Sequence, residues 1–277
     1  MKLHVINSGL FKLDGGAMFG VVPRSMWEKL NPPDSKGLCT WAMRCLLIED
    51  GKKLILIDCG MGDKQDAKFF SHYEPSGETL STSLRAAGFH EDDITDVLLT
   101  HLHFDHCGGA VKREGEKLLP VFKNATYWSN AEHWEWAVNP NPREKASFLK
   151  ENILPIQESG QLRFLTDGSS DVHENMIVKT VSGHTESMLI PHIKMGDKTI
   201  VYAADLFPSK WHLPLPYVMA YDTRPLLTMN EKERFLKEIA DNNYFVFYEH
   251  DPVTELSTLH YTEKGIREKE SLRLVDL

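Results

Sequence analysis

Short apolar runs alternate with turn signals along the whole chain and predict many short strands with a few helices between them. In the N-terminal half, strands are expected at residues 3–7, 17–22, 40–49, 53–57 and 97–99. Gly15-Gly16 and Asp50-Gly51 are the turn signals between the first four of these strands. In the C-terminal half, strands are expected at residues 125–128, 176–181, 188–193, 199–203 and 244–248.

Helical periodicity appears in four segments, residues 78–87, 130–138, 143–152 and 229–240. In the first, Leu80, Leu84 and Ala87 share one face and Gly88 ends the helix. Residues 23–37 are expected to form a loop with one helical turn around Trp27. A helix placed between two strands indicates a layered α/β domain. Without a repeat or an evident linker, residues 1–277 are expected to form a single domain.

Composition narrows the class of protein. Hydrophobic residues make up 42% of the 277 residues and charged residues 26%, which is typical of a globular protein. The net charge of −9 disfavours nucleic acid or an anionic membrane as partner, and no apolar run is long enough for a transmembrane helix. The N-terminus lacks a secretory signal pattern, and the four cysteines lack C-x-x-C spacing, so reduced thiols in a cytoplasmic protein are expected.

One stretch contains a cluster of side chains that can bind a metal ion. Residues 97–109, VLLTHLHFDHCGG, begin as a buried strand and then present His101, His103, Asp105 and His106 within six positions. Imidazole and carboxylate groups clustered at a strand end are suited to binding a transition metal such as zinc. The alternative, a solvated polar loop, is less favoured because this combination is rare by chance. Cys107 is expected to be a small buried residue and not a ligand.

Further metal-competent side chains follow other predicted strands: His184, Asp205, His250 and, at a fifth strand end, Asp58. Strand ends at one edge of a sheet converge in space. Without Asp58, the set contains five histidines and two aspartates, which suits two metal ions sharing a carboxylate better than one four-coordinate zinc. Zn²⁺ is expected, with Fe²⁺, Mn²⁺ or Co²⁺ as alternatives. Asp58 could cap the next segment or orient a metal ligand from behind.

At these residues the chain resembles the metallo-β-lactamase superfamily, and specifically its lactonase-like branch. The resemblance is carried by DGGAMFGVVPRSMW, THLHFDHCGG, SGHTES and ADLFPSKWHLPLPYVMAYD. That branch contains quorum-quenching acyl-homoserine lactone lactonases, YtnP-like proteins and relatives of methyl parathion hydrolase. The resemblance implies an α+β fold, a four-layer αβ/βα sandwich with two mixed sheets flanked by helices. It also implies a first metal on His101, His103 and His184, a second on Asp105, His106 and His250, a bridging Asp205, and Asp58 supporting the metal loop.

Several positions separate this chain from other branches. His103 is not the glutamate of the di-iron branch, and Asp205 is not the thiolate of true β-lactamases. The tail after His250 is too short for the helical substrate domain of glyoxalase II enzymes. Pro208 stands where small lactonases of this kind place a tyrosine, and Tyr217, Tyr221 or His212 is a candidate to replace it. The expected substrate pocket contains Phe19, Trp27, Phe207, His212 and Tyr217.

The function expected from this site is hydrolysis by a hydroxide held between two metal ions. Asp105 is the expected proton shuttle to the leaving group. The favoured substrate is a small apolar lactone or ester, with N-acyl homoserine lactones as the specific candidates. The alternatives are a phosphotriester or phosphodiester hydrolase on the same scaffold and a metal-binding protein without catalysis. The family resemblance is the sole basis for expecting a homodimer.

Overall fold

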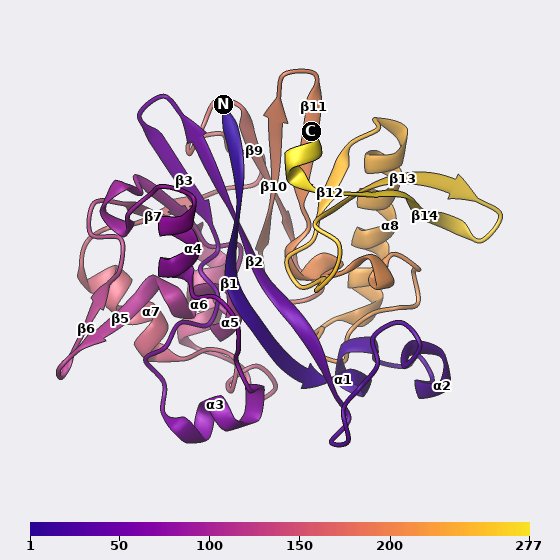
Figure 1. Cartoon of the computed structure of the whole chain (residues 1–277), viewed down its shortest axis with the longest axis horizontal. Coiled ribbons are helices and arrows are strands. Elements are labelled where there is room, and N and C mark those ends of the chain that lie inside the picture. The colour runs from indigo at the N-terminus through magenta and orange to yellow at the C-terminus, as the bar shows by residue number, and fades with distance from the viewer.

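Two six-stranded sheets form the centre of the molecule in the computed structural model, which describes all 277 residues (Figure 1). In spatial order, the first sheet contains β1 (Lys2–Asp14), β2 (Leu38–Asp50), β3 (Lys53–Ile57), β4 (Asp96–Leu98), β7 (Thr126–Asn130) and β8 (Leu162–Leu165). The second contains β14 (Gly265–Leu272), β13 (Leu256–Thr262), β12 (Phe245–Phe247), β11 (Lys198–Tyr202), β10 (Met188–Met195) and β9 (Met176–Val181). A separate hairpin joins β5 (Val111–Glu114) and β6 (Lys117–Pro120).

The helices lie outside the sheets (Figure 1). They are α1 (Gly15–Phe19), α2 (Arg24–Trp27), α3 (Ala67–Tyr73), α4 (Leu80–Ala86), α5 (Phe104–Cys107), α6 (Ala131–Val138), α7 (Lys150–Glu158) and α8 (Pro225–Asp241). α4, α6 and α7 lie beside the first sheet, and α8 lies beside the second. This mixed α+β arrangement, with helices outside two facing sheets, confirms the predicted fold class. None of the helices has the length and apolar character needed to cross a membrane.

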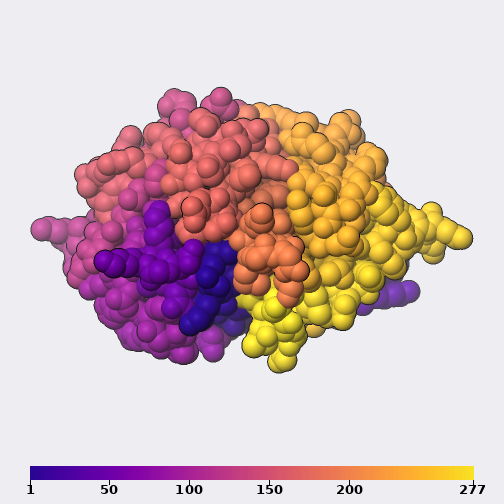
Figure 2. Space-filling model, turned by 90° about the horizontal axis from the view of Figure 1, so that it is seen from above, coloured from indigo at the N-terminus to yellow at the C-terminus, as the bar shows by residue number.

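The largest apolar core lies between the two sheets. A cluster of 32 buried residues includes Ile55 and Ile57 of β3 together with Ile200 and Tyr202 of β11. The Tyr202 hydroxyl donates a hydrogen bond to the main-chain oxygen of Arg44 in β2, at 3.1 Å, so the sheets are also joined by a polar contact. Seen from above, the purple residues of the N-terminal half and the yellow residues near the C-terminus lie on opposite sides, and salmon and orange residues fill the upper and middle part of the view (Figure 2).

Parallel strand pairs explain why the functional edge exists. β3 and β4 are parallel neighbours in the first sheet, as are β11 and β12 in the second. The carboxyl ends of each pair therefore lie at the same edge of their sheet. Main-chain hydrogen bonds from Ala42 and Arg44 of β2 to the main-chain oxygens of His250 and Glu249 bring the two edges together.

Most predicted elements are found, but two predictions are corrected and some elements had not been predicted. Residues 17–22 were predicted to be a strand, and instead β1 continues to Asp14, whose carboxylate caps α1 by accepting from the main-chain N–H of Ala17 at 2.7 Å. The helix predicted at 143–152 begins only at Lys150, because residues 143–147 form a turn that packs on the metal loop. The patterns of α3 and of the β13–β14 hairpin were not recognised.

Candidate metal centre

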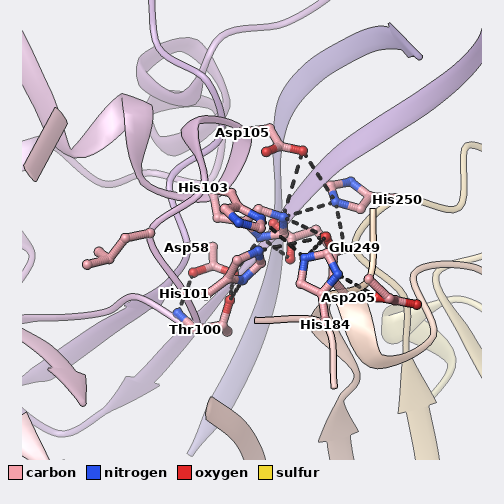
Figure 3. A network of polar contacts seen from close by, with 12 residues as sticks. Asp58, Thr100, His101, His103, Asp105, His184, Asp205, Glu249 and His250 are labelled. Atoms are coloured by element: carbon pink, nitrogen blue, oxygen red, sulfur yellow. Dashed lines mark hydrogen bonds and ion pairs between the residues drawn. The ribbon is translucent and has the colours of Figure 1, made fainter. Parts of the chain in front are cut away.

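The strand edges bring together all seven side chains that the sequence suggested as metal ligands (Figure 3). Each is at most 7% exposed. They form two groups, within each of which the donor atoms lie no more than 4.8 Å apart: His101, His103, His184 and Asp205, and Asp105, His106 and His250. The sequence motif and the three later strand ends therefore converge on one buried site.

The loop after β4 is shaped by its backbone. His103 is extended, and its main-chain oxygen accepts from the N–H groups of His106 and Cys107, which starts the single turn of α5. Gly108 and Gly109 follow directly, and a Cβ atom at either would collide with the main-chain oxygen of Met61 or Cys59. Glycine is needed here because the backbones pack so closely.

In two of the histidines, the ring nitrogen that points away from the centre of the site (the outer nitrogen) lies beside a hydrogen-bond acceptor. His184 Nδ1 lies 2.7 Å from Asp222 Oδ1, and His250 Nδ1 lies 2.7 Å from the main-chain oxygen of Ala42. Both Nδ1 atoms must therefore carry a hydrogen. In the neutral imidazoles, the Nε2 atoms consequently present lone pairs to the centre, as metal-ligating histidines do.

Asp58 fixes the orientation of two more histidines. It accepts from the main-chain N–H of Thr100 at 2.8 Å and from the Thr100 hydroxyl at 2.6 Å. Because the Thr100 hydroxyl donates to Asp58, it accepts from His101 Nδ1, which lies 3.1 Å away. His106 Nδ1 lies 3.2 Å from Asp58 Oδ2 and 3.0 Å from Glu249 Oε2. Asp58 thus contacts the metal loop from behind the expected ligands.

The fifth histidine uses its other nitrogen. His103 Nε2 faces Glu144 Oε1 at 3.5 Å, which leaves His103 Nδ1 directed inward, 3.2 Å from His184 Nε2. Glu144 is held in place by hydrogen bonds from Trp136 Nε1 at 2.7 Å and from the Asn141 amide at 2.5 Å. The turn at residues 141–147 therefore orients a metal-binding histidine.

The inward-facing donor atoms of the candidate ligands lie so close together that positive charge is required between them. His106 Nε2 and His250 Nε2 are 3.1 Å apart, so two neutral imidazoles would place their lone pairs against each other. Asp205 faces both groups, because its Oδ1 lies 3.1 Å from His250 Nε2 and its Oδ2 lies 3.1 Å from His184 Nε2. Either protons or metal cations must occupy this space.

The electrostatics agree with this requirement. Burial opposes charge on His184, but Asp205 and Asp222 overcome it and raise the pKa of its imidazole to about 10. Burial likewise opposes charge on His250, yet Asp205 and Glu249 raise its pKa to about 9. A site that attracts protons so strongly also attracts divalent cations, which compete for the same lone pairs. The imidazole and carboxylate donors fit two such cations, with Asp205 in position to contact both.

Four residues that the sequence did not suggest hold the ligands from behind: Thr100, Glu144, Asp222 and Glu249. Burial, reinforced by Asp58, raises the pKa of Glu249 to about 8. Glu249 and Asp222 carried a signal, since one precedes His250 and the other ends the last of the recognised motifs. Glu144 carried none, because its segment was expected to be helical.

A cavity of about 320 Å³ opens onto the site. Its floor includes five of the seven candidate ligands, namely His103, Asp105, His184, Asp205 and His250. Its walls include Leu13, Met18, Tyr73, Phe104, Arg143, Met219 and Tyr221. A larger hollow of about 640 Å³ lies on the other side of the metal loop, against α4, and is lined by charged residues of both signs. None of the candidate ligands lines that hollow, so the smaller cavity is the candidate substrate pocket.

None of the five residues expected to form the substrate pocket lines this cavity, and the expectation is corrected. Phe19, Trp27 and His212 form a stack, with ring centroids 5.5 Å and 5.0 Å from Phe19, and Tyr217 packs edge-on against Phe19 at 6.4 Å. Phe207 is buried in the core between the sheets. Their apolar character reflects packing beneath the pocket wall.

Contacts within the chain also explain three residues that the sequence singled out, His212, Pro208 and Cys107. His212 is held by the Ser209 hydroxyl at 2.7 Å and the main-chain oxygen of Met18 at 2.9 Å, so it cannot reach the substrate. The main-chain oxygen of Pro208 accepts from the N–H of His250 at 3.0 Å. The Cys107 thiol donates to the main-chain oxygen of Leu102, and burial raises its pKa to about 12.

Known proteins resemble this chain over most of its length. The family model for the metallo-beta-lactamase superfamily matches residues 44–250. An N-acyl homoserine lactonase of a Bacillus species is 24% identical over 266 residues, which cover 90% of this chain and 93% of the lactonase.

Two solved structures share the fold. A probable metal-dependent hydrolase from Staphylococcus aureus has a TM-score of 0.87 and 26% identity, with 98% of each chain covered. The dizinc quorum-quenching lactonase AidC, solved with a homoserine product, has a TM-score of 0.81 and 23% identity over 98% of this chain and 95% of its own. These relatives are consistent with the lactonase-like branch. With the family model matching most of the chain and the donor side chains gathered at the sheet edges, this protein belongs to the metallo-beta-lactamase superfamily.

Proposed function

We propose that this protein is a dinuclear metal-dependent hydrolase that opens lactone or ester bonds, with N-acyl homoserine lactones as the first substrates to test. The observation that carries the proposal is the pair of donor groups that share Asp205 at the floor of a cavity. The lactonase relatives support the choice of substrate.

The proposed location is the cytoplasm, supported by four buried cysteines that are all free thiols.

In the proposed site, His101, His103 and His184 would hold one cation, Asp105, His106 and His250 would hold the other, and Asp205 is placed where it would contact both. When bound, two such cations, which we propose are Zn²⁺, supply hydroxide near neutral pH and polarise the carbonyl that is attacked. Asp58, Glu144 and Asp222 fix the histidine rings through their outer nitrogens. The protein thereby holds its ligands in place before the substrate arrives.

Asp105 is the proposed proton carrier. Its Oδ2 atom lies 3.7 Å from His250 Nε2 and 3.8 Å from His106 Nε2, and the residue also lines the cavity. It can therefore accept the proton of the attacking water and deliver it to the alcohol oxygen that leaves. No serine or cysteine nucleophile is needed for this reaction.

The pocket favours a neutral, partly apolar substrate. Leu13, Met18 and Met219 contribute apolar surface to its walls. The only guanidinium among the lining residues is that of Arg143, and it already donates to the main-chain oxygens of Ala220 and Asp222. Arg143 is thus the one cationic side chain that the wall offers to a charged substrate group.

The test combines metal analysis with a pH-indicator assay of hydrolysis. After loading with excess Zn²⁺ and removal of free metal, two ions per chain are expected, together with turnover of N-acyl homoserine lactones. Fewer than two ions per chain would contradict the dinuclear site. An aryl phosphotriester is included as the alternative substrate, and efficient phosphotriester hydrolysis with inert lactones would replace the lactonase proposal.

A further inference from the structure

His133, on α6, is a fully buried histidine close to the metal centre that belongs to neither donor group. Its ring centroid lies 6.3 Å from that of His101. Its Nε2 atom accepts from the main-chain N–H of Leu102 at 2.8 Å, and its Nδ1 atom lies 2.5 Å from the main-chain oxygen of Glu186. Because an N–H group only donates and a carbonyl oxygen only accepts, Nε2 carries the lone pair and Nδ1 carries the hydrogen. Both nitrogens are therefore used within the chain, and the ring is not available to a metal ion.

The two partners of His133 lie in the two segments that supply the histidines of the first donor group. Leu102 is the residue between the two histidines of the H-x-H sequence, and Glu186 is two residues after His184. These segments are more than 80 residues apart in the chain, as the pairing of His184 with His103 shows. One imidazole ring thus bridges the backbones that carry three of the four donors.

Leu102 depends on side chains for its hydrogen bonds. The residue is fully buried, and no main-chain oxygen accepts from its N–H group. His133 supplies the acceptor that a buried N–H group requires. The main-chain oxygen of Leu102 accepts from the Cys107 thiol at 3.3 Å. The position of the backbone between the two ligands therefore depends on His133.

The turn at Glu186 is held against α6 at two points. The next residue, Ser187, has a left-handed backbone with φ of 49°, which costs free energy in any residue except glycine. The Ser187 hydroxyl donates to Glu132 Oε2 at 2.8 Å. Glu132 and His133 are neighbours on α6, so this helix holds the strained turn that follows His184.

α6 is itself fixed to the first sheet. Asn130, the last residue of β7, caps the helix by accepting from the main-chain N–H groups of Glu132 at 2.8 Å and of His133 at 3.1 Å. The Asn130 amide also donates to the main-chain oxygen of Leu165 in β8, at 3.1 Å. The His133 ring is therefore attached to a rigid part of the fold.

We propose that His133 is a positioning residue that sets the distance between the two backbone segments of the first donor group and thereby the affinity of that group for its metal ion. The inference rests on the proposed function, because the role requires a cation on this donor group. Unlike Glu144 and Asp222, which contact the ligand rings, His133 acts on the backbone. The second donor group depends less on it, since two of its three members lie in the turn of α5 and the third follows β12.

Three variants separate the two hydrogen bonds. In His133→Gln the side-chain oxygen can take the place of Nε2 and keep the bond to Leu102. In His133→Asn the side-chain amide can take the place of Nδ1 and keep the bond to Glu186. His133→Leu keeps neither bond.

The measurement is the affinity of the two Zn²⁺ ions, each determined by competition with a chelator. The variants His184→Ala and His250→Ala identify which ion belongs to the first and which to the second donor group. His133→Leu should weaken the first ion about 10- to 100-fold and the second by less than about threefold. The glutamine and asparagine variants should lie between the wild type and His133→Leu. Equal weakening of both ions, or unchanged affinities in all three variants, would overturn the inference.

His192→Leu is the matched control. His192 is also a buried histidine, with Nδ1 3.1 Å from the main-chain oxygen of Ile190, but it lies on β10 and packs against Phe235 of α8. Its loss should leave both metal affinities unchanged, whatever it does to stability, which urea unfolding in chelator records for every variant. If His133→Leu does not fold, the glutamine and asparagine variants decide the question.

The affinity measurement needs no substrate, which separates this inference from the proposed function. If the wild type binds two ions but hydrolyses neither lactones nor the phosphotriester, the hydrolase proposal fails and the ratio of the two affinities still tests His133. If the wild type binds a single ion, the dinuclear proposal fails. Weakening of that ion in both His133→Leu and His184→Ala would then support the inference, and an unchanged affinity in His133→Leu would contradict it.

Discussion

The metal centre and the pocket wall lie within one cavity, yet they are built in different ways. The metal centre is assembled from residues that follow strands, so the two sheets determine its position. The wall comes from the end of β1, from α1, from the end of α3, from the turn at residues 143–147 and from the loop at residues 219–221. The first region is fixed by the two sheets, whereas the second depends mainly on the segments that connect the strands.

This difference explains why the two regions were predicted unequally. Metal ligands are recognisable from residue type and spacing, because few side chains bind transition metals. Aromatic and apolar residues carry no such mark, since packing and substrate binding use the same side chains. Phe19 and Trp27 were therefore assigned to the wall although they pack beneath it.

The largest effect is expected when a ligand of the metal centre is removed. The change His103→Ala should remove one ligand of the first donor group, with loss of at least one bound metal and of hydrolysis by about 1,000-fold or more. Metal content after loading and the pH-indicator assay measure the two losses. His260→Ala is the control, because His260 is an exposed histidine on β13. Retention of full metal content by the His103 variant would remove it from the ligand set.

A smaller effect is expected where the wall supports the metal centre. Glu144→Gln and Asp222→Asn keep the shape of each side chain but weaken its contact with His103 or His184. Each should lower metal affinity about 10- to 100-fold, measured by competition with a chelator. Glu233→Gln on the exposed face of α8 should have no effect. Unchanged affinity in both variants would show that these carboxylates do not tune the metals.

The corrected pocket predicts that stability and substrate binding respond to different residues. Phe19→Leu removes part of the aromatic stack and should lower the free energy of unfolding by about 1–3 kcal/mol, while KM changes by less than about twofold. Met219→Ala, on the cavity wall, should raise KM for substrates with longer acyl chains. Urea unfolding and steady-state kinetics measure the two responses. A KM change for Phe19→Leu as large as that for Met219→Ala would restore Phe19 to the pocket.

The last effect is gradual and concerns the dependence of stability on pH. Burial lowers the pKa of His212 to about 3, so the folded protein keeps it neutral below pH 6.5, where the unfolded chain becomes protonated. The unfolded state then binds more protons, and stability falls as the pH drops from 6.5 toward 3. His212 should contribute a loss of about 1 kcal/mol per pH unit in that range.

The variant His212→Asn isolates this contribution. It should be less stable than the wild type at pH 7, and the gap should narrow between pH 6.5 and pH 4.5. Unfolding is measured in chelator, so that release of metal does not enter the comparison. A gap that stays constant with pH would show that His212 is not the titrating group.

Some of the architecture could be predicted from local pattern. Alternating apolar runs located the central strands, because a buried strand must be apolar whatever its neighbours are. The start of α1 was missed because Asp14 caps a short helix in a segment whose composition also suits a strand. The turn at residues 143–147 was predicted to be helical because its periodicity is sound, but Glu144 turns inward to His103.

The sequence by itself determined the identity of the seven candidate ligands, because their chemistry and their position after strands are local properties. Only the tertiary structure decided which of them face each other, which nitrogen of each histidine points inward, and that Glu144, Asp222 and Glu249 stand behind them. It also decided that Tyr73 and Tyr221 reach the pocket whereas Tyr217 and His212 do not. The physical reason is that side-chain burial and hydrogen-bond partners arise from contacts between segments far apart in the chain, which no local pattern records.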